Sequence, residues 1–198
     1  MGSHCLSLKT GNSAHSAFQL YPVAHETLVS PLPDPMPFDK AVVLPLAIST
    51  AASALYQKEH LALPYPSTNS KPTGKTILIW GGSSSVGSAA IQLAVASGYE
   101  VVTTTSERNF EFVASLGAST VTDNKSPAVA QQLGPALQDK ELVGVFDAIS
   151  EMATFEKIAA LLRDLGLAKQ KIRVAAVLPS DKTWEEFDLR PGRYSVLG

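Results

Sequence analysis

The chain of 198 residues contains one cysteine, Cys5, and four histidines. A single cysteine excludes an intrachain disulfide and any zinc site built from cysteines. The histidines show no H-E-x-x-H or other paired spacing that is typical of metal ligands. We therefore predict that the protein has no metal site. The four histidines are spread along the chain, at His4, His15, His25 and His60.

The chain also lacks a strong charge of either sign. Its formal net charge is −2, from 16 Lys and Arg against 18 Asp and Glu, and no Lys/Arg run occurs. This balance gives no electrostatic case for a nucleic-acid interface, so we expect none. The apolar runs have the length of strands and are interrupted by Gly, Pro or charge, so we expect no membrane-spanning segment. The N-terminus has no apolar signal-peptide core. These absences favour an intracellular, cytoplasmic protein.

The sequence from residue 76 onward alternates between strand and helix patterns. Residues 76–80 form a continuous apolar run, which is typical of a strand that is buried on both faces. The alternation predicts an α/β fold with a Rossmann-type, doubly wound parallel sheet. Further strands are expected at residues 100–104, 120–122, 142–150, 171–179 and 192–198, and helices at 85–97, 108–117, 126–139 and 152–166, the third of them broken.

The first 40 residues have a different character, since they are rich in Pro, Ser and His. Apolar residues at 18–23 and 28–29 suggest short strands. A helix is expected from residue 38, with Pro45 either as a break or as the first turn of a new helix. We therefore predict a small N-terminal part, residues 1–40, and a Rossmann-type domain, residues 41–198.

The turn "GGSSSVG" after the first predicted strand is the main candidate site. Gly81 and Gly82 allow a tight turn and let a ligand approach the backbone. The serines that follow place hydroxyls beside the free N–H groups of a helix start, which suits a pyrophosphate. The spacing is neither G-x-G-x-x-G nor a P-loop. A Gly-Ser connection without a ligand is the alternative.

The end of the second strand bears on cofactor choice. NAD-binding domains usually carry Asp or Glu there, but residues 103–106 read Thr-Thr-Thr-Ser. Ser106 and Asn109 can donate hydrogen bonds to a 2′-phosphate, and Arg108 can pair with its charge. Only Glu107 adds a carboxylate nearby. The pattern favours NADPH over NADH, against the alternative that Ser106 caps the next helix and Arg108 is solvated.

Several segments resemble the medium-chain dehydrogenase/reductase superfamily, and in particular its zinc-free branch of fungal trans-acting enoyl reductase-like and quinone oxidoreductase-like proteins. The resemblance runs from about residue 17 almost to the end of the chain. The segments that carry it are "AFQLYPVAHETLVSPLPD", "VVLPLAISTAASALYQ", "WGGSSSVGSAAIQLA", "TTTSERNFEFVASLGA" and "FDAIS".

The resemblance implies a role for particular residues. Leu46 and Thr50, in "PLAISTA", would line the substrate and nicotinamide side, and Ser150 with residues 177–179 would lie near the nicotinamide ribose. It also implies that Ser106, Arg108 and Asn109 hold the 2′-phosphate. The residues expected around the pyrophosphate are Gly82, Ser83, Ser84, Ser85, Val86, Gly87 and Ser88.

The chain also departs from the family pattern. Residues 1–40 would be a remnant of a GroES-like β domain, and the chain is expected to be truncated at both ends. Asn124 stands where relatives often have Tyr, and Ser16 where they often have Gly. Two functions stay open: reduction of an activated C=C bond of an enoyl or enone, or a non-redox role as a pseudoenzyme, interaction module, isomerase or cyclase.

The partners and the catalytic groups are less defined. The expected partner is a small-molecule substrate, such as a polyketide-type intermediate, and a polyketide synthase is a further candidate. The strand expected at residues 192–198 would be a sheet edge through which a homodimer could form. No catalytic residue is assigned: Tyr21, Tyr56 or water could supply a proton. Asp147, at a strand end, is expected to be structural.

Overall fold

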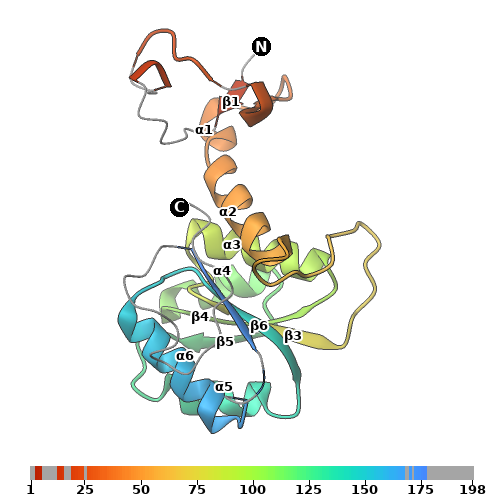
Figure 1. Ribbon diagram of the computed structural model, residues 1–198, viewed down its shortest axis with the longest axis vertical. Helices are drawn as coiled ribbons and strands as arrows, with labels where there is room; N and C mark the ends of the chain where they lie inside the picture. The colour runs from red at the N-terminus through yellow and green to blue at the C-terminus, as the bar shows by residue number, and fades with distance from the viewer. Residues whose placement is uncertain are drawn as a thin grey trace. The chain divides into compact units, whose positions relative to one another are not determined.

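Figure 1 shows a computed structural model of the chain. The structure describes residues 3–5, 13–15, 19–24, 26–167, 170 and 172–177. The chain divides into two compact units, Met1–Ser49 and Thr50–Gly198, called here the N-terminal unit and the sheet unit. The division falls inside a helix, α2 (Pro45–Tyr56). The domain boundary expected at residue 40 stays a prediction.

The N-terminal unit contains a two-stranded antiparallel ribbon. Strand β1 (Ser3–Cys5) pairs with β2 (Val29–Pro31), which follows the 3-10 helix η2 (Glu26–Leu28). A strand was expected at 18–23, but the described residues there, 19–23, form none. The unit also has the 3-10 helix η1 (Ser13–His15), the short helix α1 (Phe38–Ala41) and the start of α2. Pro45 is the first residue of α2, where its missing N–H costs nothing.

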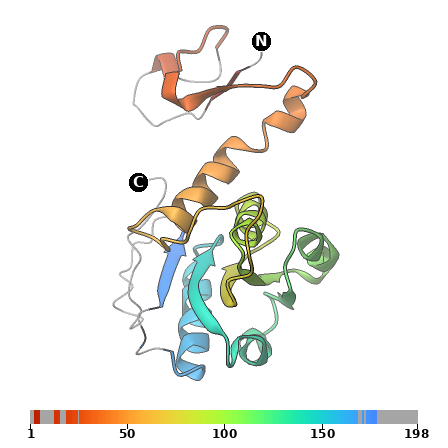
Figure 2. The same ribbon diagram turned by 90° about the vertical axis from the view of Figure 1, so that its right-hand side faces the viewer.

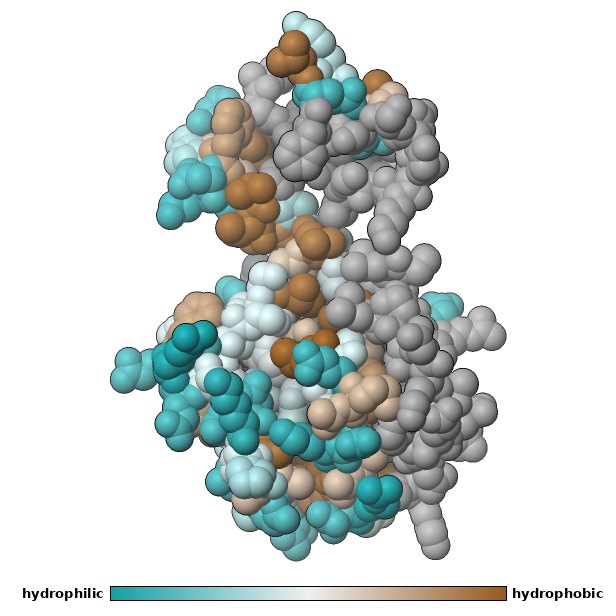
Figure 3. Space-filling model, turned by 90° about the vertical axis from the view of Figure 1, so that its left-hand side faces the viewer, coloured by the Kyte–Doolittle hydropathy of each residue, from teal (hydrophilic) through white to brown (hydrophobic). Residues whose placement is uncertain are grey.

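The N-terminal unit has an apolar face that its described residues leave uncovered. Figure 3 shows apolar side chains, in brown, at the surface. Part of this face is hollowed into a cavity of about 460 Å³, lined among others by Val29, Leu32, Met36, Leu44 and Ile48. The exposed large apolar residues of the unit are Leu20, Tyr21, Val23, Met36, Phe38, Val42, Val43, Leu44, Leu46 and Ile48.

The sheet unit contains five parallel strands in the order β5-β4-β3-β6-β7. This topology confirms the predicted Rossmann-type α/β fold. The strand expected at residues 192–198 lies outside the described residues. The strands are β3 (Lys75–Trp80), β4 (Glu100–Thr105), β5 (Thr120–Asp123), β6 (Glu141–Asp147) and β7 (Arg173–Ala176). The connecting helices are α3 (Ser85–Ala96), η3 (Glu107–Asn109), α4 (Phe110–Ser115), α5 (Val129–Leu137) and α6 (Met152–Asp164).

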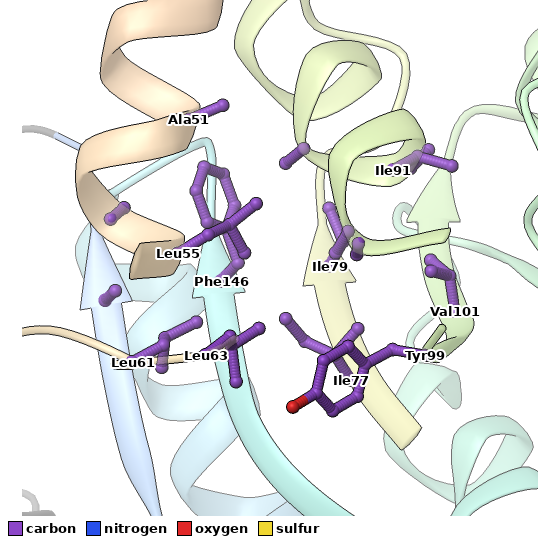
Figure 4. Packing of buried hydrophobic residues seen from close by; sticks show 14 of the residues in the cluster. Ala51, Leu55, Leu61, Leu63, Ile77, Ile79, Ile91, Tyr99, Val101 and Phe146 are labelled. Atoms are coloured by element: carbon purple, nitrogen blue, oxygen red, sulfur yellow. The ribbon is translucent and has the colours of Figure 1, made fainter. Parts of the chain in front are cut away.

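Helices lie on both faces of the sheet, as the term doubly wound implies (Figure 2). On one face, Leu55 of α2 and Ile91 of α3 pack with Ile77, Ile79 and Phe146 of the strands (Figure 4). On the other face, residues of α5 and α6 pack against the alternate side chains of the same strands. Full burial of one such side chain contributes about 1.5–3 kcal/mol. The two cores together hold the carboxyl ends of the strands in place.

Helix α5 corrects one expectation. The sequence predicts a broken helix at 126–139, but α5 is continuous and contains Pro135. Pro135 stands two residues before the last residue of the helix, so its missing N–H affects only the last turn. Val129, Leu133 and Leu137, four residues apart, are buried on one face and anchor the helix to the core.

One helical stretch, Phe38–Tyr56, is long and apolar enough to cross a membrane by length and composition alone. From the sequence we expected no such stretch, because Asp39, Lys40 and Pro45 interrupt its apolar residues. Its last part belongs to the sheet unit, where Ala51 and Leu55 are completely buried. Only 33% of its apolar window is buried, and one such helix by itself is weak evidence for a membrane segment.

Candidate functional site

The two central strands of the sheet place the candidate site. From β3 the chain continues to β4 on one side, whereas β6 continues to β7 on the other side. The order of strands therefore reverses between β3 and β6, which pair side by side. In open parallel sheets, ligands bind at such a switch point, beyond the carboxyl ends of the strands. The glycine turn, residues 81–84, follows β3 there, and the loop 148–151 follows β6.

Two glycines of the turn and one in the first turn of α3 have no room for a side chain. Gly81 has φ +82°, and a Cβ there would lie 2.7 Å from Cδ1 of Ile149. A Cβ on Gly82 would collide with Oγ1 of Thr103, and one on Gly87 with the carbonyl oxygen of Gly81. The turn therefore packs as tightly as glycine allows, and the backbone itself forms its surface.

Threonines of β4 form hydrogen bonds to this turn and to the end of β3. The carbonyl oxygen of Thr104 accepts from the N–H groups of Gly81 (3.1 Å) and Gly82 (2.9 Å), and its Oγ1 also accepts from Gly81 (3.2 Å). Thr103 Oγ1 donates to the Ile79 carbonyl at 2.7 Å. From the sequence alone, these threonines indicated only that no acidic residue stands at the end of the second strand. Their role depends on the pairing of β3 with β4, which no local pattern shows.

Helix α3 begins directly after the turn. Ser84 is its N-cap: Oγ accepts from the N–H of Gly87 (3.0 Å) and donates to the Gly81 carbonyl (2.9 Å). Ser88 Oγ donates to the carbonyls of Ser84 and Gly82. Among the described residues, the N–H groups of Ser85 and Val86 meet no acceptor. These two donors, at the positive end of the helix, are the ones left for an anion.

The residues expected around the 2′-phosphate are linked to the turn by hydrogen bonds. Thr105 Oγ1 donates to Ser83 Oγ at 2.6 Å. The Asn109 amide donates to both Ser83 Oγ and Ser106 Oγ, each at 3.1 Å. Ser106 precedes η3, but its side chain makes no capping hydrogen bond. The structure thus brings Ser83, Ser106 and Asn109 together, and it leaves Arg108 exposed beside them.

A buried carboxyl group ends β6. Asp147 is completely buried, and its Oδ1 accepts from the N–H groups of Ile149 (3.0 Å) and Ser150 (3.1 Å). Its Oδ2 is buried without a partner in the described part of the chain. Burial raises the pKa of Asp147 to about 6, although the two backbone donors oppose the rise. A carboxyl group that ionises less readily than usual therefore lies at the switch point.

The raised pKa predicts a pH effect on stability. The folded protein holds a proton on Asp147 that the unfolded chain releases above its ordinary pKa of 3.8. Stability from this group is therefore lost as the pH rises from about 4 to about 6, by about 3 kcal/mol in total. The variant Asp147→Asn lacks this titration. Urea unfolding of both proteins should show wild-type stability falling relative to the variant over this range, and a constant difference would contradict the assignment.

The other residues that were expected in the site belong to several different segments of the chain. Leu46 is exposed in the N-terminal unit, and Thr50 is buried at the start of the sheet unit. Val177 donates its N–H to Ser150 Oγ at 3.0 Å, whereas residues 178–179 lie outside the described ranges. Tyr56 OH bonds to the Leu93 carbonyl near the last turn of α3, which is the end of that helix away from the glycine turn.

Asn124 follows β5 at the same edge of the sheet. Its N–H donates to the Thr105 carbonyl (3.0 Å), and its own carbonyl accepts from Lys157 Nζ (3.1 Å). Its side-chain Oδ1 is buried, with no partner in the described ranges. Across those ranges no three His, Cys, Asp or Glu side chains gather as a metal site would require. The absence of zinc stays a prediction.

Comparison with known proteins agrees with this geometry. Residues 85–169 match a family described as zinc-binding dehydrogenase. The trans-enoyl reductase himH of Aspergillus japonicus is 51% identical over 163 residues, which cover 82% of this chain and 46% of that protein. The dehydrogenase azaJ of Aspergillus niger is 50% identical over 141 residues, covering 71% of this chain and 41% of the relative. The chain thus spans less than half the length of these two relatives.

Solved structures show the same fold. The CurK enoyl reductase superposes with a TM-score of 0.65 at 23% identity, covering 85% of this chain and 46% of that one. An alcohol dehydrogenase superfamily protein from Novosphingobium aromaticivorans gives a TM-score of 0.60 at 26% identity, with the same two coverages. The chain therefore shares its fold with these two structures over most of its length.

Proposed function

Since the chain belongs to the medium-chain dehydrogenase/reductase superfamily, with enoyl reductase-like relatives, we propose that it binds NADPH and reduces an activated C=C bond of an enoyl or enone. The superfamily implies an oxidoreductase with a nicotinamide cofactor. The choice of NADPH and of the substrate is our proposal. A polyketide-type intermediate is the substrate class that we favour, with the reaction taking place in the cytoplasm.

The hydrogen-bonded cluster beside the turn is the observation that carries this proposal. Ser83, Ser106 and Asn109 form one network, and the strand end that usually holds a carboxylate in NAD-binding domains presents Thr105 instead. A carboxylate would repel a 2′-phosphate, whereas hydroxyl and amide donors bind it. Arg108, exposed next to them, adds the positive charge that a phosphate requires.

The residues present fit the cofactor in two places. The unpaired N–H groups of Ser85 and Val86 would bind pyrophosphate oxygens, and the bare backbone of Gly82 would let them approach. Ser106, Arg108 and Asn109 would hold the 2′-phosphate. When bound, the cofactor supplies the hydride, and the protein orients the reactants and excludes water. Ser150, Thr50 and Leu46 are the residues that we propose on the nicotinamide and substrate side.

We further propose that the protein forms a homodimer through the edge of the sheet. The strand expected at residues 192–198 would form this edge, and an unpaired edge favours pairing with a second chain. Light scattering coupled to gel filtration tests this directly. A monomer at micromolar concentration would contradict the proposal.

A polyketide synthase as the protein partner is a separate proposal, to be tested by co-purification with the synthase.

Calorimetric titration with NADPH and with NADH tests cofactor binding. We expect NADPH to bind with micromolar affinity. NADH should bind at least about tenfold more weakly, because it lacks the 2′-phosphate and its charge-assisted hydrogen bonds. Absorbance of NADPH during incubation with simple enones then tests reduction. Binding without reduction of any enone would favour the non-redox alternative. No binding of either nucleotide would contradict the proposed function.

A further inference from the structure

We infer that Asp147 is a positioning residue for the cofactor turn: its carboxylate fixes the loop after β6, whose Ile149 side chain forms the wall of the turn opposite β4. This inference rests on the proposed function, since the turn is taken as the cofactor site. Nothing in it requires Asp147 to touch the cofactor or the substrate.

The first observation is the way in which Asp147 closes the loop. Its Oδ1 accepts two consecutive backbone N–H groups, from Ile149 and Ser150. Ser150 has φ +59°, a left-handed conformation that costs a residue other than glycine about 1–2 kcal/mol. The loop therefore needs an interaction that holds it, and the carboxylate of Asp147 supplies two hydrogen bonds at that point.

The second observation is the fit between this loop and the glycine turn. Both Cγ1 and Cδ1 of Ile149 lie 2.7 Å from the place where a Cβ of Gly81 would stand. The N–H of Ala148 donates to the Trp80 carbonyl at 2.9 Å, so the loop continues the pairing of β6 with β3. A shift of the loop would move Ile149 off Gly81 and would leave the turn supported by β4 alone.

The third observation is the free-energy cost of burying the Asp147 carboxyl group. Asp147 is completely buried, and its Oδ2 meets no donor among the residues that the structure describes. A buried polar atom without a partner costs about 1–3 kcal/mol, and a charged group costs more. In the described part of the chain, the charge of Glu151 also acts on Asp147, and it disfavours the ionised carboxylate and raises its pKa. The two hydrogen bonds from Ile149 and Ser150 are the contacts that offset part of this cost, so the buried carboxyl group and the loop conformation depend on each other.

Two variants separate positioning from mere stability. Asp147→Ala removes both hydrogen bonds to the loop, and we expect NADPH to bind about tenfold more weakly or worse. Asp147→Asn keeps an acceptor at Oδ1 and should bind NADPH within about threefold of wild type. Amide hydrogen exchange of Ile149 and Ser150 should be faster in the alanine variant and near wild type in the asparagine variant.

Leu133→Ala provides the matched control. Leu133 is a fully buried residue of α5, so its replacement destabilises the fold by about 2–5 kcal/mol without removing a hydrogen bond from the turn or from the loop after β6. The folded fraction of this variant should bind NADPH as wild type does. If Asp147→Ala also binds like wild type, or if Leu133→Ala loses binding as much as Asp147→Ala does, the inference is overturned.

A failure of the proposed function gives a different result. In that case wild type itself binds no NADPH, while exchange at Ile149 and Ser150 still reports on the loop. Selective acceleration of these two amides in Asp147→Ala, with restoration in Asp147→Asn, would support the positioning role without the cofactor. Unchanged exchange in both variants would overturn it.

Discussion

Replacing both Ser106 and Arg108 by alanine is expected to weaken NADPH binding about 100-fold and NADH binding by less than about threefold, because only NADPH carries the 2′-phosphate. Each charge-assisted hydrogen bond to that phosphate contributes about 1.5–3 kcal/mol. Asn109 is left in place because its amide also bonds to Ser83 Oγ in the glycine turn. Calorimetric titration of the double variant with both nucleotides measures the two effects separately.

The control for this prediction removes the same charge elsewhere. Arg163 is exposed in the last turn of α6, so Arg163→Ala changes the net charge of the protein by the same amount. It should leave both affinities unchanged. An equal loss of NADPH and NADH affinity in the double variant would mean that Ser106 and Arg108 support the turn rather than read the phosphate. No loss of either would place the 2′-phosphate elsewhere.

The sheet could be predicted closely because its strands are continuous apolar runs. Residues 76–80 and 100–104 were expected as strands, and β3 and β4 differ from them by one residue at one end. Such runs are typical of parallel strands buried on both faces, and glycines mark where the helices stop. Gly117 and Gly166 follow α4 and α6 with φ +106° and +70°. The periodicity of hydrophobic residues therefore determined both the type and the order of the elements.

The failures share a physical cause, which is that they depend on contacts between distant segments. The break expected within residues 126–139 did not occur because Leu133 and Leu137 anchor α5 in a core that only the folded sheet creates. The support that Thr103 and Thr104 give to the turn depends on the register of β4 against β3. Local composition holds no information on either. The serines and glycines of the turn could be found from sequence, but the network that links them could not.

The contact between Gly82 and Thr103 leads to the second large prediction. A Cβ on Gly82 would collide with Thr103 Oγ1 and would lie 2.9 Å from Cδ1 of Ile91, so Gly82→Ala must displace the turn or the strand. We expect a loss of about 1–3 kcal/mol of stability and a loss of NADPH affinity of about tenfold or more. Gly134→Ala is the matched control, since no atom outside its chain neighbours and the backbone of its own helix lies within 4 Å of its Cβ position. That variant should keep its affinity, and no gain in stability is expected because Pro135 follows and disfavours a Cβ on the preceding helical residue.

A double-mutant cycle shows whether the collision itself is the cause. Thr103→Ala alone loses the hydrogen bond to the Ile79 carbonyl, at a cost of about 1 kcal/mol. Combined with Gly82→Ala, it also removes the oxygen that the new methyl group would meet. The double variant should therefore lose less stability than the sum of the two single losses, with a coupling of about 0.5–3 kcal/mol. Strict additivity in urea unfolding would show that the contact with Cδ1 of Ile91, and not the one with Thr103 Oγ1, excludes a side chain at Gly82.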